Sequence, residues 1–344
     1  MERSVLLLAD LATPMAIRVA ATLRLVDLAG PDGATCEQLA GQTETAAPAL
    51  RRLLDHLVTV DVFVLDPSSA RYRATGLGAQ MREDAPDGGV LPLLDIGRAG
   101  GRAELAFVEL LHAIRTNEAG YSRHFGRDFW SDIDTDPQLR RSFDEQMTWR
   151  FHLQAPQIAA GYDWSRFERI LDVGGGNGTL LQAILEAHPT VSGQVLDLAP
   201  SARAATERFT DAGLGTRADA VAGSFFDPLP TGFDAYLLCD VIHDWGDHHA
   251  RAILERCREA AGKSAPVVLV EPTRGQDTTT GIDLFMLMCF GGGDRTTDEL
   301  TALAAESRLR VHSHQRVSYG RAALELTPAD GHHPTATDRA ATDS

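Results

Sequence analysis

The chain has 344 residues, of which 44% are apolar and 23% charged, and its formal net charge is −16 at pH 7. This length allows two or three domains, and the composition is typical of a globular protein with a sizeable core. The negative charge repels nucleic acid and anionic membranes and suits neutral or cationic small molecules, so we expect neither nucleic acid nor membrane as a partner.

The N-terminal stretch MERSVLLLADLATPM is a poor match for a signal peptide, because acidic residues follow its short apolar run, and it predicts a helix. No stretch approaches the roughly 20 apolar residues that cross a bilayer. The cysteines are scattered and form no CxxC pair; they are Cys36, Cys239, Cys257 and Cys289. Reduced thiols of this kind favour a cytoplasmic protein, and a zinc site built from them is not expected.

Two helices and two short strands follow one another near the N-terminus. The helices are expected at 36–41 and 46–60, and the strands meet at the turn DPSSA. This is the pattern of a winged helix-turn-helix, which serves either for packing and dimerisation or for DNA binding. The second helix carries Arg51 and Arg52 but also Asp55, and no basic stripe surrounds it. The pattern therefore favours dimerisation.

Residues 89–165 are expected to be mostly helical. Two long helices are predicted from the stretches RAELAFVELLHAIRTNEAG and DPQLRRSFDEQMTWRFHLQAPQIAAGY. The region also holds an aromatic cluster, which consists of Tyr121, Phe125, Phe129, Trp130, Phe143, Trp149 and Phe151. Such a cluster is either hydrophobic core or the wall of a pocket for a flat ligand.

From residue 167 onward, strands and helices alternate. Apolar strands such as RILDV and FDAYLLCDV are each followed by a helical stretch. This alternation predicts an α/β fold with a doubly wound, mostly parallel sheet and helices on both faces. The stretches LRVHSHQRVS and RAALELTP are expected to end the fold as an antiparallel strand pair, and the polar residues 329–344 are expected to be disordered.

A glycine-rich loop at 174–178 follows the first strand of this sheet, in the stretch ILDVGGGNGTLL. Glycines let a ligand approach the backbone, and ligands of open parallel sheets bind beyond the carboxyl ends of the strands. Asp197 follows about 20 residues later, where an acid usually holds ribose hydroxyls. The G-x-G-x-G spacing, with Thr179 in the place of the last dinucleotide glycine, and Asp172 within the strand favour S-adenosylmethionine over NAD or FAD. A tight turn without a ligand is the remaining alternative.

The stretch AYLLCDVIHDWGDHH places His243 directly after an apolar strand. Three interpretations are open: a proton acceptor, a metal ligand, or a polar residue that ends the strand. A metal site would draw on Asp244, Asp247, His248 and His249, but we expect this set to be split between a loop and different faces of a helix, so no metal site is predicted. We favour the proton acceptor, since a neutral imidazole can take a proton from a phenol near neutral pH.

Four motifs together resemble one family. LDVGGGNG, GSFFDPLP, VIHDWGD and GGGDRTTDEL stand in the order and spacing of the S-adenosylmethionine-dependent O-methyltransferases that modify plant phenolics and bacterial aromatic polyketides. The resemblance spans nearly the whole chain. It implies a winged-helix-like dimerisation domain at 1–88, a helical connector lining the acceptor pocket at 89–165, a methyltransferase domain that binds S-adenosylmethionine at 166–328, and a disordered tail at 329–344. It also implies a homodimer formed through the N-terminal domain.

The resemblance assigns roles to individual residues. The cofactor would contact Asp172, Gly174, Gly176, Gly178, Asp197, Leu198, Ser224, Phe225 and Cys239. The hydroxylated acceptor would contact Met147, Phe151, Asp244, Asp283, Met286 and Phe290. His243 corresponds to the catalytic base, and Glu271 and Glu299 correspond to the acids that flank and orient it. Two positions depart from the family pattern: Ser224 replaces an aspartate that contacts the adenine amine, and Cys239 replaces a lysine.

The function predicted from these features is methyl transfer to a hydroxyl group of a small aromatic natural product, such as a polyketide-derived phenol. Two alternatives remain open. Some relatives that lack a working base use the bound cofactor for decarboxylation or hydroxylation, and the presence of His243 argues against that chemistry. A regulator that binds DNA through the winged helix and senses a ligand in the sheet domain is opposed by the negative charge.

Overall fold

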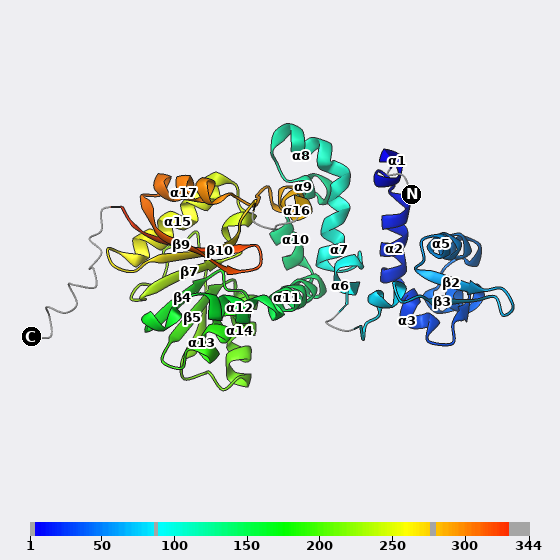
Figure 1. The fold of residues 1–344 in the computed structure, drawn as a ribbon, viewed down its shortest axis with the longest axis horizontal. Helices are drawn as coiled ribbons and strands as arrows, with labels where there is room; N and C mark the ends of the chain where they lie inside the picture. The colour runs from blue at the N-terminus through cyan, green and yellow to red at the C-terminus, as the bar shows by residue number, and fades with distance from the viewer. Residues whose placement is uncertain (1–3, 86–88, 276–279, 330–344) are drawn as a thin grey trace, which may run out of the picture. The chain divides into compact units, whose positions relative to one another are not determined.

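The computed structural model describes residues 4–85, 89–275 and 280–329, so the predicted tail lies outside the described residues apart from Ala329. The chain divides into two compact units (Figure 1). One comprises Met1–Leu105 and Trp130–Gln146, and the other Ala106–Phe129 and Met147–Ser344. The units therefore do not follow the predicted boundaries, because the connector expected at 89–165 is shared between them.

The first unit contains a winged helix. Its elements up to residue 104 are α1 (Val5–Leu8), α2 (Ala12–Thr22), α3 (Leu25–Ala29), β1 (Ala34–Thr35), α4 (Cys36–Thr43), α5 (Ala47–Thr59), β2 (Phe63–Asp66), β3 (Arg71–Ala74), the 3₁₀ helix η1 (Gly78–Met81) and, at the start of the predicted connector, α6 (Leu91–Leu94) and α7 (Ala99–Glu104). The strands form an antiparallel sheet in the order β1-β3-β2. Leu54 and Leu57 of α5 pack in one core with Phe63 and Tyr72 of the hairpin. The Tyr72 hydroxyl donates to Asp55 at 2.6 Å, so this acid stabilises the fold.

The second unit is built on a seven-stranded sheet in the order β6-β5-β4-β7-β8-β10-β9. The parallel strands are β4 (Arg169–Val173), β5 (Ser192–Asp197), β6 (Ala218–Ala222), β7 (Ala235–Cys239) and β8 (Val267–Pro272). At the other end, β10 (Arg321–Pro328) runs antiparallel to both β8 and β9 (Leu309–Ser318). This arrangement confirms the predicted α/β fold with a doubly wound, mostly parallel sheet.

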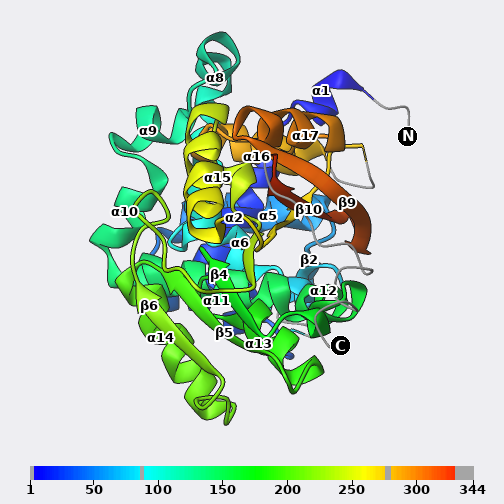
Figure 2. The same cartoon turned by 90° about the vertical axis from the view of Figure 1, so that its left-hand side faces the viewer.

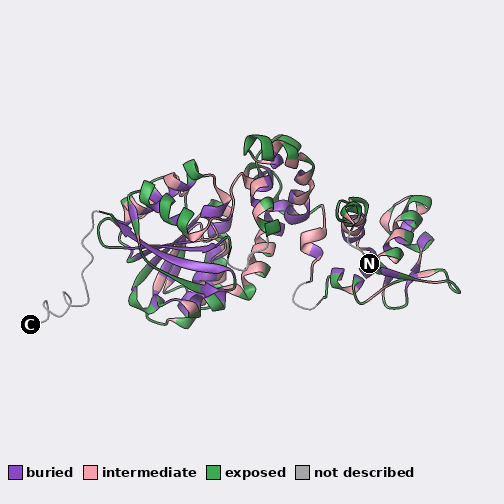
Figure 3. Cartoon of the chain, turned by 45° about the horizontal axis from the view of Figure 1, so that its top comes forward, coloured by how far each residue is buried: buried purple, intermediate pink, exposed green. Residues whose placement is uncertain are grey.

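Helices cover both faces of this sheet (Figures 1 and 2). The helices on these faces include α13 (Thr179–Ala187), α14 (Ala199–Asp211), α15 (Asp247–Ala261) and α17 (Thr297–Glu306). This part of the chain also contains η4 (Trp164–Arg166), η5 (Ile242–Asp244) and α16 (Thr280–Phe290). Apolar residues of α15 and α17 pack with the sheet in one core cluster, and those of α13 and α14 pack in another. The strands are buried between the two layers, as Figure 3 shows. Their carboxyl ends share one edge of the sheet, which is the usual ligand site of such folds.

Hydrogen bonds explain why the connector does not form a domain of its own. Its elements are η3 (Leu105–Glu109), α8 (Leu110–Thr116), α9 (Gly120–Phe125), α10 (Phe129–Thr135), α11 (Pro137–His152) and α12 (Gln154–Gly161). Ala99 N donates to Ser142 Oγ at 2.9 Å, and Arg102 pairs with Asp132 at 2.9 Å, which holds α7, α10 and the start of α11 together in the first unit. The end of α11 belongs to the second unit, together with α8 and α9.

A search of the described residues for a membrane-spanning helix gave none that is both long enough and apolar enough.

Candidate active site

The loop that follows β4 has a conformation that requires its glycines. Gly174, Gly176 and Gly178 have φ angles of 73°, 59° and 77°, in the left-handed region that other residues rarely adopt. A Cβ atom at Gly178 would lie 2.5 Å from the Phe209 ring, and one at Gly174 would lie 2.9 Å from the Val241 side chain. The glycine loop therefore lies directly against the segment that follows β7.

Backbone N–H groups tie this loop to the end of β5. Gly174 N donates to Leu196 O at 2.8 Å, and Gly176 N donates to Asp197 Oδ2 at 2.9 Å. The other carboxylate oxygen of Asp197 accepts from Leu198 N at 2.7 Å, and the Leu198 side chain is exposed. Asp197 is therefore fixed beside the loop, and its carboxylate is of a type that accepts hydrogen bonds from hydroxyl donors such as a ribose.

Asp172 in β4 is buried without compensation. It is 1% exposed, and neither of its carboxylate oxygens has a hydrogen-bond partner. Burial, with a smaller contribution from the charge of Asp197, raises the pKa of Asp172 to about 7. A Cβ atom at Gly175 would lie 2.4 Å from Oδ2 of this carboxylate, so Asp172 lies directly beneath the glycine loop. An unpaired buried carboxylate at this point fits a cationic group, such as the ammonium of an amino-acid ligand.

The other predicted cofactor residues follow the neighbouring strands. Phe225, after β6, is half-buried, and its ring lies 3.4 Å from the place of a Gly174 Cβ atom. Ser224 Oγ accepts from Phe226 N at 3.2 Å, which fixes the local turn. Cys239 is half-buried at the end of β7, and burial raises the pKa of its thiol well above the usual range. All of these residues lie in the second unit, at the carboxyl edge of the sheet.

His243 lies on η5, directly after β7, and is 3% exposed. Its Nδ1 atom is 3.2 Å from Asp294 Oδ1, and its Nε2 atom is 3.4 Å from Asp244 Oδ1. Asp294 is also 3% exposed. The contact with Asp294 favours the tautomer that carries its proton on Nδ1, which leaves Nε2 as a proton acceptor.

Carboxylates control the protonation of this histidine. Burial alone would lower the pKa of His243, but the neighbouring acids Asp244, Asp294, Glu271 and Asp240 outweigh burial and raise this pKa to about 9. These acids therefore favour the imidazolium form of His243. A cation bound beside the histidine would lower its pKa again and free the base.

Glu271, at the end of β8, is 1% exposed and orients the turn rather than the imidazole. Its Oε1 atom accepts from Val241 N at 3.1 Å and from Ile242 N at 2.8 Å. Its Oε2 atom has no hydrogen-bond partner, and burial raises the pKa of this carboxyl to about 7. The resemblance assigned Glu271 to the acids that flank and orient His243, and one of its oxygens does lie within 4.8 Å of a ring nitrogen. In the structure it holds the backbone just before His243, because Asp294 occupies the Nδ1 side.

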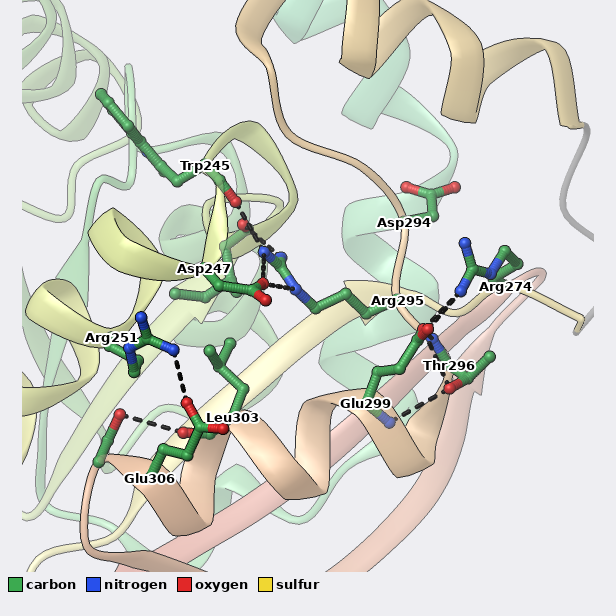
Figure 4. A network of polar contacts seen from close by, with 12 residues as sticks. Trp245, Asp247, Arg251, Arg274, Asp294, Arg295, Thr296, Glu299, Leu303 and Glu306 are labelled. Carbon is green, nitrogen blue, oxygen red and sulfur yellow. Dashed lines mark hydrogen bonds and ion pairs between the residues drawn. The ribbon is translucent and has the colours of Figure 1, made fainter. Parts of the chain in front are cut away.

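The prediction for Glu299 needs correction. Its carboxylate accepts from Thr296 N at 2.8 Å and pairs with Arg274 at 2.5 Å (Figure 4). It forms a capping box at the start of α17 and is half-exposed. The structure thus gives Glu299 a role in starting α17, and Asp294, five positions earlier, is the acid that contacts His243.

The loop 291–296 supplies contacts that the sequence analysis missed. Gly293 N donates to His243 O at 2.8 Å, and a Cβ atom at Gly292 would lie 2.2 Å from that same oxygen. Arg295 donates to the carbonyl oxygens of Ile242 at 2.9 Å and Trp245 at 2.8 Å. It also pairs with Asp247 at 2.8 Å, as Figure 4 shows. The loop therefore binds η5 on both sides of the histidine. The motif GGGDRTTDEL contained the signal, since three glycines followed by an acid allow close backbone approach.

The predicted acceptor residues come from two helices of the second unit. Met147 and Phe151 lie on α11 and are half-buried. On α16, Met286 is buried, and the ring of Phe290 meets Phe129 edge-on at 5.0 Å between centroids. Asp283 Oδ1 accepts from Asp294 N at 2.9 Å, so it supports the acid that contacts His243.

Three potential metal ligands lie close together: one atom each of Asp240, His243 and Glu271 lies within 4.8 Å of the other two. Both oxygens of Asp240 already bind Arg321, at 3.0 and 2.5 Å. Glu271 Oε1 already accepts two backbone N–H groups. Cationic and backbone donors thus occupy much of the ligand set that a metal ion would need.

The other potential ligands named from the sequence point elsewhere. Asp247 pairs with Arg295, and His248 and His249 are exposed on the first turn of α15. His249 also lies against the Trp245 ring, at 5.6 Å between centroids. These residues do not share a ligand site with His243.

The sequence matches two family models. An O-methyltransferase domain matches residues 107–309, and an O-methyltransferase dimerisation domain matches residues 6–82.

Similar proteins share most of the chain. It is 47% identical to 2,7-dihydroxy-5-methyl-1-naphthoate 7-O-methyltransferase of Streptomyces carzinostaticus, over 91% of this chain and 94% of the relative. It is 40% identical to aclacinomycin 10-hydroxylase RdmB of Streptomyces purpurascens, over 89% of this chain and 83% of that relative. A solved structure of NcsB1, an O-methyltransferase from neocarzinostatin biosynthesis in complex with S-adenosylmethionine and 2-hydroxy-5-methyl naphthoic acid, has a TM-score of 0.90 and 46% identity, and the match covers 95% of this chain and 99% of that one.

The roles of Asp294 and Glu299 can be separated by titration. In Asp294→Asn, His243 loses a negative charge that favours its imidazolium, so we expect its pKa to fall by about one pH unit or more from about 9. In Glu299→Gln, this pKa should stay unchanged, and only the cap of α17 should weaken, by at most about 1 kcal/mol. The C2 proton of His243, followed by NMR from pH 5 to 10, measures both. An equal change in the two variants would contradict the assignment.

Arg295 should determine how firmly η5 is held. In Arg295→Met, the carbonyls of Ile242 and Trp245 lose their charged donor, so we expect amide hydrogen exchange over residues 241–247 to accelerate by about 10-fold or more. The matched control is Arg251→Met, since Arg251 forms a surface ion pair with Glu306. In this control, hydrogen exchange over residues 241–247, measured by mass spectrometry, should equal that of the wild type. If Arg295→Met also exchanged at the wild-type rate, η5 would be held without the contacts of Arg295.

Proposed function

Because this chain belongs to the O-methyltransferase family, we propose that it transfers a methyl group from S-adenosylmethionine to a hydroxyl group of a small aromatic natural product, with His243 as the general base. One observation carries the proposal. His243, which pairs with the buried Asp294, follows β7. Val241, which lies between β7 and His243, is next to Gly174 of the glycine loop. A base and a loop suited to the cofactor thus lie side by side in one unit.

The residues around the loop fit the cofactor, which supplies an electrophilic methyl group on a cationic sulfonium. The carboxylate of Asp172 would bind the ammonium end, and Asp197 would accept from the ribose hydroxyls. Phe225 would lie against the adenine. Burial restricts Asp172, and hydrogen bonds from Gly176 N and Leu198 N hold Asp197. The protein would thus mainly supply alignment, which can contribute several kcal/mol to the barrier reduction.

On the acceptor side, the chemistry is a proton transfer. The acceptor hydroxyl would donate its proton to His243 Nε2 as its oxygen bonds to the methyl carbon. The bond between that carbon and the sulfonium sulfur would break, with S-adenosylhomocysteine as the leaving group. The N–H group at Nδ1 would stay protonated and donate its hydrogen bond to Asp294. On the other side of the ring, Asp244 Oδ1 lies 3.4 Å from Nε2. Two carboxylates therefore stabilise the imidazolium that forms. General base catalysis of this kind contributes roughly 10²–10⁴ in rate.

The identity of the relatives supports an aromatic acceptor. The relative from Streptomyces carzinostaticus acts on a dihydroxynaphthoate, and NcsB1 is seen with a naphthoic acid. The flat side chains of Phe151 and Phe290 suit such rings. The hydroxylase relative, at 40% identity, supports a second candidate, in which the same fold hydroxylates its substrate. We favour methyl transfer because His243 is present and is held by a buried carboxylate.

A homodimer formed through the N-terminal unit is part of the proposal. The dimerisation model matches residues 6–82, and exposed apolar side chains gather at the start of the chain: Val5, Leu6, Leu8 and Leu11. A surface of this kind is typical of a protein interface. A cytoplasmic location remains the prediction, and the four free cysteines support it.

Replacement of His243 tests the proposed chemistry. Wild-type protein, incubated with S-adenosylmethionine and hydroxynaphthalenes, should give products heavier by one CH₂ group in mass spectrometry. His243→Ala should lose turnover by roughly 10²–10⁴, because no base accepts the proton. Calorimetry should show unchanged cofactor affinity. A product heavier by one oxygen would favour the hydroxylase alternative, and normal turnover of the variant would exclude His243 as base.

Asp172 should link cofactor binding to pH and stability. Its pKa in the fold, about 7, lies above its usual value, so ionisation opposes folding, and stability falls as pH rises from about 4 to 7. At pH 8 and without cofactor, Asp172→Asn should therefore be more stable, by up to about 4 kcal/mol. Its affinity for S-adenosylmethionine should fall by about 10- to 100-fold. Thermal melting and calorimetry measure the two effects; a variant that is less stable yet binds normally would contradict both.

A further inference from the structure

The helix α11 carries a cation that the proposed reaction does not use. Met147, Arg150 and Phe151 stand at positions i, i+3 and i+4, so their side chains share one face of the helix. Two of the three are the residues of α11 predicted to contact the acceptor. Arg150 is half-buried, with 26% of its side chain exposed. An arginine therefore stands between the two hydrophobic residues of the expected acceptor wall.

The surroundings leave this arginine with free donors. Its ion-pair partner in the described parts of the chain is Asp240, at 3.4 Å between Nη2 and Oδ2. That distance exceeds the roughly 2.7–2.9 Å of a good charge-assisted hydrogen bond. Both oxygens of Asp240 already accept closer bonds from the buried Arg321, at 3.0 and 2.5 Å. Asp240 is thus satisfied by Arg321, and most of the five N–H donors of Arg150 remain for a ligand.

Arg150 lies near the acids that surround His243. Its partner Asp240 has a carboxylate oxygen within 4.8 Å of a ring nitrogen of His243. Burial raises the pKa of Asp244 to about 6, and the positive charges of His243 and Arg150 oppose this rise. Asp244 is the residue beside Nε2. Arg150 therefore lies close enough to act on the acid that stands beside the nitrogen expected to receive the acceptor proton.

We propose that Arg150 binds a carboxylate group on the acceptor, so that the preferred substrates are hydroxylated aromatic carboxylic acids. The inference rests on the proposed function and specifies its substrate class. A planar guanidinium with free donors can bind a carboxylate through two parallel hydrogen bonds. That contact fixes a flat molecule at a point away from its reacting hydroxyl, which orients it toward His243. The ring itself would rest on the hydrophobic side chains of α11 and α16.

A pair of matched probes tests the proposal without turnover. Protein loaded with S-adenosylhomocysteine is titrated by calorimetry with 1,4-dihydroxy-2-naphthoic acid, and then with its methyl ester, which has the same ring without the charge. The wild type should bind the acid at least about 10-fold more tightly than the ester. In Arg150→Gln, affinity for the acid should fall by about 10- to 100-fold, and affinity for the ester should change by less than about 2-fold. Arg150→Lys should keep part of the preference.

Two control measurements show whether the effect is specific to Arg150 and to the acceptor. Arg141→Gln, which removes an exposed arginine from the same helix, should leave all affinities unchanged. Affinity for S-adenosylhomocysteine in Arg150→Gln should also be normal; a loss there would show that the arginine binds the carboxylate of the cofactor instead and would overturn the proposal. So would a wild type that binds the acid no more tightly than the ester. The binding preference is measured without turnover, so it does not depend on methyl transfer. If neither probe were methylated, that result would count against the proposed function and not against the role of Arg150.

Discussion

The site depends on the contact between His243 and Asp294. A buried imidazole can accept and release a proton only if its charged form is compensated, since water cannot solvate it at 3% exposure. Asp294 provides that compensation at 3.2 Å and sets the tautomer. The backbone contacts of Gly293 and Arg295 keep the loop of Asp294 against η5, and Glu271 holds the turn from the other side. The loop 291–296 and the end of β8 thus together fix one side-chain orientation.

Charge is distributed unevenly around this contact. On the cofactor side, Asp172 is buried without a partner, which favours a cationic ligand. On the acceptor side, Arg321 neutralises Asp240, and Arg150 adds a positive charge that is only loosely paired. A site with an uncompensated acid on one side and a surplus cation on the other can hold two ligands of different charge next to each other. The overall charge of −16 shows none of this local arrangement.

The relatives show that this fold alone does not determine the reaction. A methyltransferase and a hydroxylase resemble the chain at 47% and 40% identity, so similarity over most of the chain is compatible with either reaction. The deciding groups must be the few that touch the reacting atoms. In this chain we propose that those groups are His243 and the acids around it, and this is why the proposed function rests on their geometry rather than on overall similarity.

The sequence by itself determined the α/β fold, the glycine loop and the position of His243. These features are local: the alternation of strands and helices, the need for positive φ in the loop, and the end of a strand are each encoded by neighbouring residues. It did not determine which acid reaches His243, since Asp294 and Glu299 lie five positions apart in one motif and only the path of the loop separates them. Nor could it join Arg150 on α11, Asp240 directly after β7 and Arg321 on β10. Such contacts depend on how strands and helices pack across the chain, and only the tertiary structure decides that.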